Sequence, residues 1–240
     1  MKWQLPIPEL GIEGKLNKED LDYKLSAIPE DLKDKSVLDL ASFDGYYSFV
    51  CAQRGASPVV AIDNCLGEEI AFGPDKGVIK KEGNSFPNPK EHELAVLRTY
   101  KKFSILNKDL DNPIHFIPMD IVDLDKIKMK FDIVLCFGLY YHVKDIYGLF
   151  ENCYNLCNDI VIIEGHALLL EDKPFIYINN ILELHNDCTN FWSPSVNGLI
   201  KLLLRIGFKG FKIVGARGSR ILLIAYKEKQ KSELSTTENK

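Results

Sequence analysis

The sequence predicts an α/β fold: a doubly wound, mostly parallel sheet of about seven strands that ends in an antiparallel C-terminal strand pair. Three observations carry this prediction. From Ser36 onward, short apolar runs alternate with longer segments whose apolar residues recur at helical spacing. The apolar runs are rich in Val and Ile without polar alternation, as in parallel strands that are buried on both faces. The last two runs are joined by a short glycine-containing turn, which favours an antiparallel pair.

The predicted elements follow one another in a regular order. Strands are expected at Val37–Leu40, Val59–Ile62, Ile114–Pro118, Phe131–Phe137, Ile160–Glu164, Phe211–Val214 and Ile221–Tyr226. Helices are expected at Lys18–Ile28 (capped by Asn17), Tyr46–Arg54, Glu91–Leu106, Asp145–Leu156 and from the cap at Ser195 to Ile206. Two stretches, 66–90 and 165–195, break this rhythm and are expected to be irregular, and a loop as long as 66–90 is usually functional or mobile.

The predicted domain organisation is simple. Residues 1–35 mix proline, glycine and charge, and are expected to form an N-terminal cover segment. Residues 36–226 are expected to form a single ligand-binding domain. Residues 227–240 are charged and polar without apolar periodicity, so a disordered tail is expected.

Composition narrows the classes of partner. The net charge of −4 and the pI near 5.8 give no support for a generally basic nucleic-acid-binding surface. No signal-peptide core and no membrane-length apolar run are present, so a cytoplasmic location is expected. The six cysteines lie mostly within apolar segments, which favours free, buried thiols. No cluster has the spacing of metal ligands, and no metal is expected.

The stretch 37–47 predicts a ligand-binding loop between a strand and a helix, with Gly45 at the helix start. Strand two ends at Asp63, 24 residues after Asp39, the spacing typical of a carboxylate that binds ribose hydroxyls. A pyrophosphate requires glycines where this loop has Ala41 and Phe43, and Asp44 would repel it. An adenosine with a positive centre fits better, and S-adenosylmethionine (SAM) is such a ligand.

Four segments in order resemble the motifs of class I SAM-dependent methyltransferases, whose fold is Rossmann-like. The segment KSVLDLASFDGYYSF resembles the first motif, VVAID the second, IPMDIVDLD the third and FDIVLCFGLYYHVKDI the fourth. The resemblance extends from about Asp31 to Tyr226. It departs from the family in the first motif, where Ala41 and Phe43 replace two of three glycines.

The resemblance implies a SAM site at the carboxyl ends of the first four strands. The loop would line the methionine and ribose, Asp63 the ribose hydroxyls and the third motif the adenine, and the end of the fourth strand would close the site near the sulfonium. The implied cofactor contacts are Asp39, Ala41, Ser42, Phe43, Asp44, Gly45, Asp63, Asn64, Asp120, Ile121, Phe137 and Gly138.

The fourth motif reads G-x-x-Y-H, a branch that includes methyltransferases of wobble-position uridine in tRNA and stand-alone enzymes of glycan and natural-product pathways. The segment ELHNDCTNFWSPSVNGLIKLLLRIGF resembles the stand-alone members. We therefore expect methylation of an oxygen or nitrogen on a small-molecule or glycan acceptor. Two alternatives stay open: a tRNA acceptor, with plain or carboxylated SAM, and a non-catalytic SAM-binding partner subunit.

The same branch suggests where the chemistry occurs. His142 is the candidate general base, because imidazole titrates near neutral pH; a purely structural role is the alternative. Tyr141 is assigned beside it in the catalytic centre. Arg217 and Arg220, near the terminal turn, could contact an anionic acceptor, although surface arginines are usually solvated. The expected acceptor contacts are Tyr140, Glu164, His166, Asn190 and Trp192, with packing in the core as the alternative for one tyrosine and for the tryptophan.

Overall fold

The computed structural model describes residues 6–7, 10–14, 18–65, 89–170, 172–181, 183–184 and 189–229. The predicted cap Asn17, nearly all of the 66–90 loop and most of the predicted tail lie outside these residues, as does Cys188. The other five cysteines are free and buried, as expected.

Seven strands form one sheet in the order β3-β2-β1-β4-β5-β9-β8. The first five strands are parallel and β9 is antiparallel to its neighbours β5 and β8, which confirms the predicted fold class. Their bounds are β1 Val37–Leu40, β2 Val59–Asp63, β3 Ile114–Pro118, β4 Phe131–Phe137, β5 Cys157–His166, β8 Gly210–Arg217 and β9 Arg220–Tyr226. The strand order reverses between β1 and β4, and ligands of such sheets bind at this switch point.

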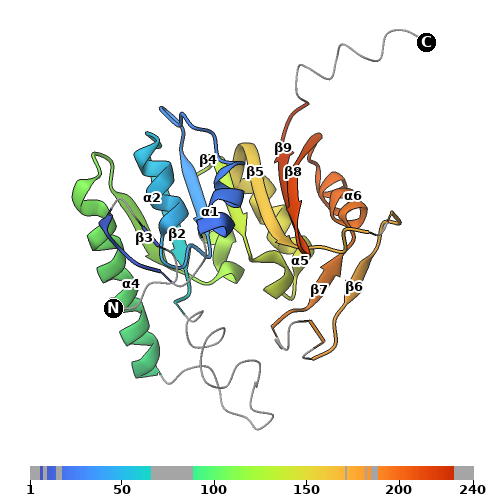
Figure 1. The fold of residues 1–240 in the computed structure, drawn as a ribbon, viewed down its shortest axis with the longest axis horizontal. Helices are drawn as coiled ribbons and strands as arrows, with labels where there is room; N and C mark the ends of the chain where they lie inside the picture. The colour runs from blue at the N-terminus through green and yellow to red at the C-terminus, as the bar shows by residue number, and fades with distance from the viewer. Residues whose placement is uncertain are drawn as a thin grey trace.

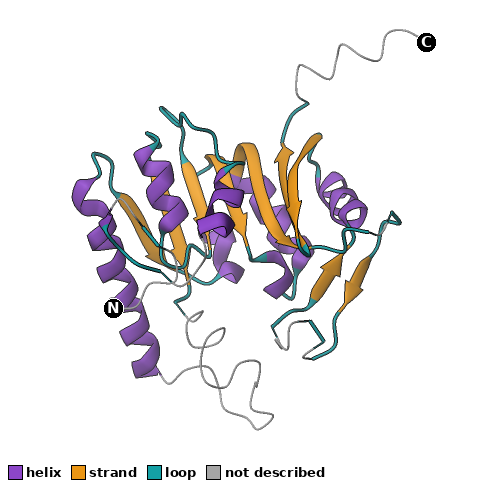
Figure 2. Cartoon of the chain, viewed as in Figure 1, coloured by secondary structure: helices purple, strands orange, loops and turns teal. Residues whose placement is uncertain are grey.

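Helices cover both faces of the sheet (Figure 1). On one face, α1, α2 and α4 contribute Leu21, Phe49 and Phe103 to a single apolar core with the sheet. On the other face, α5 and α6 pack against a second core. Figure 2 shows the sheet between these two layers. The helices are α1 Lys18–Leu25, α2 Tyr46–Gln53, α4 Pro89–Leu106, α5 Ile146–Leu156 and α6 Val196–Ile206.

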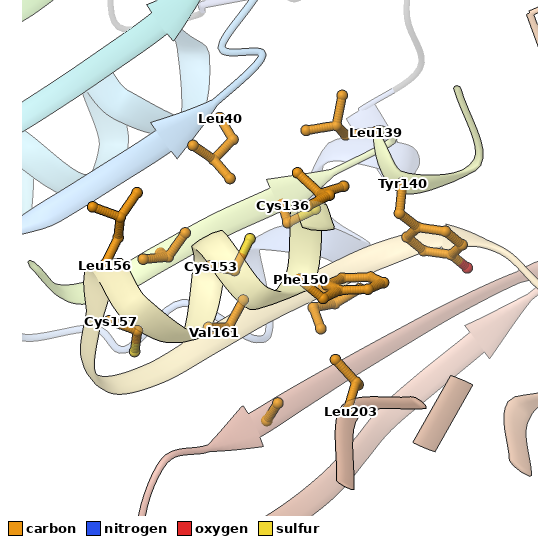
Figure 3. Close-up of a cluster of buried hydrophobic side chains, with 14 of the residues drawn as sticks. Leu40, Cys136, Leu139, Tyr140, Phe150, Cys153, Leu156, Cys157, Val161 and Leu203 are labelled. Carbon is orange, nitrogen blue, oxygen red and sulfur yellow. The ribbon is translucent and has the colours of Figure 1, made fainter. Parts of the chain in front are cut away.

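The second core extends under the end of β4. Figure 3 shows Leu40 and Cys136 from the sheet facing Phe150 and Cys153 of α5. Tyr140 closes this cluster at the carboxyl end of the sheet, where it is fully buried. A close-packed core at this point holds the strand ends, and the loops that leave them, in fixed positions.

The sequence suggested that the whole stretch 165–195 is irregular, but part of it is regular. It contains a two-stranded antiparallel ribbon of β6 Ile176–Ile178 and β7 Trp192–Pro194. The three-residue strands are too short for an alternating pattern, and proline ends the second one. Short 3-10 turns also occur at η2 Asn107–Asp109, η3 Ile121–Lys126 and η4 Tyr140–His142.

Candidate active site

The loop after β1 has left-handed backbone at every second residue. The φ angles are 53° at Ala41, 53° at Phe43 and 79° at Gly45. These are the three positions at which the family motif carries glycine. A non-glycine residue pays about 1–2 kcal/mol for this conformation. The loop therefore has the backbone conformation of a glycine-rich loop, although Ala41 and Phe43 carry side chains that disfavour this conformation.

Contacts from neighbouring strands hold this loop in place. The Phe43 amide donates to the Asp63 carboxylate at 2.9 Å, and the Ser42 amide donates to the Ile62 carbonyl at 2.9 Å. The second Asp63 oxygen accepts from the Cys65 amide at 2.6 Å. Asp63 is thus both a loop anchor and a buried acid at the end of β2. Burial raises the pKa of Asp63.

Asp39 is the buried acid on β1. It accepts from the Ser48 hydroxyl of α2 at 2.6 Å. Burial raises its pKa to about 7, although the Ser48 hydrogen bond favours the ionised form. A cationic ligand nearby would favour the carboxylate, so this acid suits a positively charged partner.

The acid after β3 caps the turn η3. One Asp120 oxygen accepts from the Val122 amide at 3.1 Å, and the other accepts from the Asn64 side-chain amide at 3.3 Å. Ile121, which is partly buried, packs beside them against the second core. The polar residues predicted for the adenosine end, Asp63, Asn64 and Asp120, are therefore brought together at the ends of β2 and β3.

One observation tests whether this loop suits a ligand. The Ser42 hydroxyl is buried and makes no hydrogen bond within the described part of the chain. A buried hydroxyl without a protein partner is costly unless a ligand or water satisfies it. Together with acids at the ends of three adjacent strands, this donor and acceptor set fits the ribose, adenine and cationic centre of SAM.

A cluster of charged residues surrounds the end of β4. Glu164 on β5 is fully buried and accepts from both sides of the Arg220 guanidinium, from Nη2 at 2.9 Å and also from Nε. Lys24 of α1 lies 3.2 Å from the same carboxylate. Burial alone would raise the pKa of Glu164, but these two cations hold it below the ordinary value. The cluster of two cations and one carboxylate carries a net charge of +1.

This cluster, defined as Lys24, Glu164, Arg220 and Tyr141, lies against Gly138. Arg220 donates to the Tyr141 hydroxyl at 3.1 Å. A Cβ placed on Gly138 would lie 3.6 Å from Arg220 Nη2 and 3.8 Å from the Tyr141 hydroxyl. Lys24 also lies over the Phe137 ring, 5.8 Å from its centroid. The end of β4 therefore faces a positively charged environment.

Residues 189–192, which lead into β7, form a wall of the candidate site beside η4. The Phe191 amide donates to the Tyr141 carbonyl at 2.8 Å, and Thr189 Oγ1 lies 2.8 Å from His142 Nδ1. Between them, Asn190 is buried; its side-chain amide donates to a backbone carbonyl, while its Oδ1 accepts no hydrogen bond from the described residues. The Trp192 indole donates to the Val143 carbonyl at 2.7 Å, which ties the wall to the turn.

Three other predicted acceptor contacts are buried beneath the surface of the site. Tyr140 is fully buried and its hydroxyl donates to the His166 carbonyl. His166 is itself buried at the end of β5, with its ring centroid 6.4 Å from that of Tyr141. Glu164 is engaged by the two cations. These three residues are buried and contact other protein groups below the surface of the site.

Sequence reasoning missed Lys24 and Lys102. Of the two arginines considered for an anionic acceptor, Arg220 pairs with Glu164 in the charged cluster, whereas Arg217 pairs at the surface with Glu19 at 3.0 Å. Lys102 of α4 is buried and pairs with Asp44 at 2.5 Å. No local pattern marks these residues, because the partners of Lys24, Lys102 and Arg220 are distant in sequence.

Among the described residues, no group of three or more His, Cys, Asp or Glu side chains is arranged to hold a metal ion. No helix in the described part of the chain has the length and apolar character needed to cross a membrane.

Comparison with known sequences finds distant relatives, while no family model matches the chain. The tRNA U34 carboxymethyltransferase of Campylobacter lari is 20% identical over 188 residues, which cover 78% of this chain and 54% of the relative. The enzyme of the same name from Helicobacter pylori is 25% identical over 214 residues, covering 84% of this chain and 65% of the relative. The chain thus spans between half and two thirds of the length of these relatives.

Solved structures show the same fold. The N-terminal domain of EvdMO1 with SAH bound has a TM-score of 0.58 at 15% identity, covering 93% of this chain and 91% of that one. Magnesium protoporphyrin IX methyltransferase from Synechocystis PCC 6803 with bound SAM has a TM-score of 0.53 at 15% identity, covering 87% and 77%. The resemblance seen in the sequence is confirmed: this chain has the Rossmann-like fold of the class I SAM-dependent methyltransferases.

Proposed function

We propose that this chain is a SAM-dependent methyltransferase that modifies an oxygen or nitrogen atom of a small-molecule or glycan acceptor. The observation that carries the proposal is the loop at residues 41–45, whose left-handed positions coincide with the glycines of the family motif. It lies at the switch point of the sheet, beside the acids Asp39 and Asp63.

The cofactor would be held by the loop and by the acids at the strand ends. Asp63 would accept from the ribose hydroxyls, because a carboxylate that already accepts two amide bonds retains further lone pairs. Asp120 and Asn64 would contact the adenine, and the Ser42 hydroxyl would bond to a polar atom of the cofactor. When bound, SAM supplies an electrophilic methyl group on a sulfonium centre.

The protein's own contribution to transfer is alignment and proton removal. Holding an acceptor in line at a fixed position can supply an effective molarity on the order of 10⁵ M or more. His142 would remove the acceptor proton. The Thr189 carbonyl, 3.3 Å from Nδ1, can only accept a hydrogen bond, so we assign the ring proton to Nδ1 and the accepting role to Nε2. Tyr141, which contacts both the His142 ring and Arg220, would fix the turn that carries this base.

The acceptor would be a compound with hydroxyl or amine donors. Asn190 supports this, because its buried Oδ1 accepts nothing from the described residues and lies in the wall beside His142. A donor from the acceptor would satisfy that oxygen. The net charge of −4 also favours a small acceptor over a polyanion.

The proposal is tested by SAH binding and by turnover. Isothermal calorimetry of the wild-type chain should detect SAH binding, and Asp63→Ala should weaken it at least tenfold. Asp123→Ala, at a surface acid paired with Lys126, is the matched control and should leave the affinity unchanged. Absence of SAH binding by the folded wild-type chain would refute the proposal. SAH binding without methyl transfer to any acceptor, alone or in a mixed library, would favour the non-catalytic alternative.

A second candidate function is carboxymethyl transfer to the wobble uridine of tRNA, the activity named for the relatives. The cluster at Gly138 favours it, since a net charge of +1 beside the end of β4 suits a transferred group that bears a carboxylate. Lys24 and Arg220 would then bind that carboxylate while sharing Glu164.

The affinities of the chain for SAM and for carboxylated SAM distinguish the two candidate functions. For carboxymethyl transfer, the chain should bind carboxylated SAM more tightly than SAM, and Arg220→Met should reduce that preference at least tenfold. Arg217→Met removes an arginine from the same turn without touching the cluster and should leave the preference intact. Equal affinity for both cofactors would exclude this candidate. Retention on tRNA that weakens steeply with salt would favour the tRNA acceptor.

A further inference from the structure

The loop at residues 41–45, called the SAM loop below, has a left-handed backbone although two of the family's glycines are missing. Ala41 and Phe43 both adopt φ 53°, a conformation that residues with a side chain disfavour. Left alone, such a loop would relax toward ordinary backbone angles and lose its ligand-binding shape. A contact with another element must therefore offset the free-energy cost of the left-handed backbone.

The loop's backbone hydrogen bonds need no particular side chain in the loop. The amides of Ser42 and Gly45 donate to main-chain carbonyls, and the Phe43 amide donates to Asp63. A loop with glycines at 41 and 43 would make the same bonds. These contacts therefore explain the shape but not the compensation for the missing glycines.

Asp44 supplies the additional contact, because it anchors the loop to another element. Its carboxylate pairs with Lys102 of α4 at 2.5 Å, with side chains exposed by only 1% and 6%. An ion pair with this little solvent has a strict geometry, since neither charge can move away without losing its partner. Asp44 stands between the two left-handed positions Phe43 and Gly45, so fixing Asp44 restricts both.

The helix that carries Lys102 is itself fixed against the loop. The next residue, Phe103, packs so close to Gly45 that a Cβ on this glycine would lie 2.6 Å from the ring. Lys102 also lies near the ring of Phe43, 5.9 Å from its centroid. Burial raises the pKa of Asp63, which also anchors the loop, and the positive charge of Lys102 offsets part of that rise. One lysine thus acts on Phe43, Asp44 and Asp63.

We propose that Lys102 is a positioning residue for the SAM loop, which it holds through Asp44 in the shape that a glycine at 43 would otherwise allow. The inference rests on the proposed function in taking SAM or SAH as the ligand of the loop. It predicts a specific coupling: the Lys102–Asp44 pair matters while residue 43 is phenylalanine, and matters less when residue 43 is glycine.

The test uses a charge-neutral pair, since Lys102→Met alone would leave a buried carboxylate unpaired and destabilise the fold. Four proteins are compared: wild type, Asp44→Asn with Lys102→Met, Phe43→Gly, and all three changes together. Lys101→Met, at the adjacent exposed lysine, is the control. Each is checked for folding by thermal melting. The first readout is hydrogen–deuterium exchange of the loop amides without ligand, and the second is the SAH dissociation constant.

The neutral pair is expected to speed exchange of the amides of residues 42–45 and to weaken SAH binding, each about tenfold, the size of one left-handed side-chain penalty. With Phe43→Gly added, each loss should shrink to about threefold or less. Unchanged exchange in the neutral pair, or a loss that persists undiminished with glycine at 43, would overturn the inference. If wild type fails to bind SAH, the proposed function fails, and the exchange experiment still decides the role of Lys102.

Discussion

The hydroxyl of Ser48 donates to the carboxyl group of Asp39 at 2.6 Å, and both side chains are buried beneath the candidate cofactor loop. The pair joins the end of β1 to α2. With a pKa of about 7, raised from 3.8 by burial, Asp39 is protonated in the folded protein across a range of pH in which the unfolded chain has lost this proton.

The first prediction follows from that difference in proton binding. Between about pH 4 and pH 7 the folded state binds one more proton at Asp39 than the unfolded state, so its contribution to the free energy of unfolding falls as pH rises. Asp39→Asn removes this penalty while keeping an acceptor for Ser48. The stability of Asp39→Asn relative to wild type should rise by about 1–3 kcal/mol from pH 5 to pH 7.

Urea unfolding at several pH values measures this effect. Asp111→Asn, at an exposed acid, is the control and should show no such change relative to wild type. A constant stability difference between Asp39→Asn and wild type over pH 5–7 would mean that Asp39 is ionised in the fold.

The second prediction concerns Glu164, whose pKa is lowered by Arg220 and Lys24 despite its burial. Its stabilising contribution is present at neutral pH and is lost as pH falls through the lowered pKa. Glu164→Gln should destabilise the protein by about 3–5 kcal/mol at pH 7, because two cations lose their buried partner. Glu151→Gln, on the exposed side of α5, should change stability by less than about 0.5 kcal/mol. Comparable melting temperatures for both variants would contradict the assignment.

The third prediction tests the close contact of Tyr140 with β5. A Cβ on Gly165 would lie 2.5 Å from the Tyr140 ring, so Gly165→Ala should cost about 1–3 kcal/mol in chemical unfolding. Gly210→Ala, where the nearest atom is 3.6 Å from the new Cβ, is the matched control. Equal stability of the two variants would show that Tyr140 can move away without cost.

The fourth prediction separates the base from its support. His142→Gln should reduce kcat about 10²-fold or more with a hydroxyl acceptor while leaving SAH affinity unchanged. Thr189→Val removes the hydroxyl beside Nδ1 and should shift the acidic limb of the pH–rate profile with a smaller loss of kcat. An unaltered rate in His142→Gln would leave this histidine with a structural role. An unaltered pH profile in Thr189→Val would remove the proposed support.

The sheet could be predicted from the sequence because each of its strands has a local signature. Buried parallel strands such as Val59–Asp63 are continuous apolar runs, and the acids at their ends mark the edge where ligands bind. Asp39 and Asp63 therefore follow from the order of strands and acids, whereas Asp120 follows from the resemblance of its segment to the third family motif. The ribbon of β6 and β7 does not, because strands of three residues have no detectable period.

The charged part of the site could not be predicted, for a different reason. Lys24, Lys102 and Arg220 are distinguished from other basic residues only by their partners Glu164 and Asp44, which lie far away in the chain. A sequence window contains one member of each pair. The left-handed angles at Ala41 and Phe43 are likewise hidden, since nothing in their side chains favours that conformation.

The cluster at Gly138 also sets an order of events during synthesis. Lys24 emerges from the ribosome early, Glu164 much later, and Arg220 later still, at the first residue of β9. Glu164 therefore lacks the guanidinium that balances it until β9 is inserted beside β5. Because β9 is itself a strand of the sheet, the cluster is completed only when the sheet is, and a nascent chain that stops before β9 cannot assemble it.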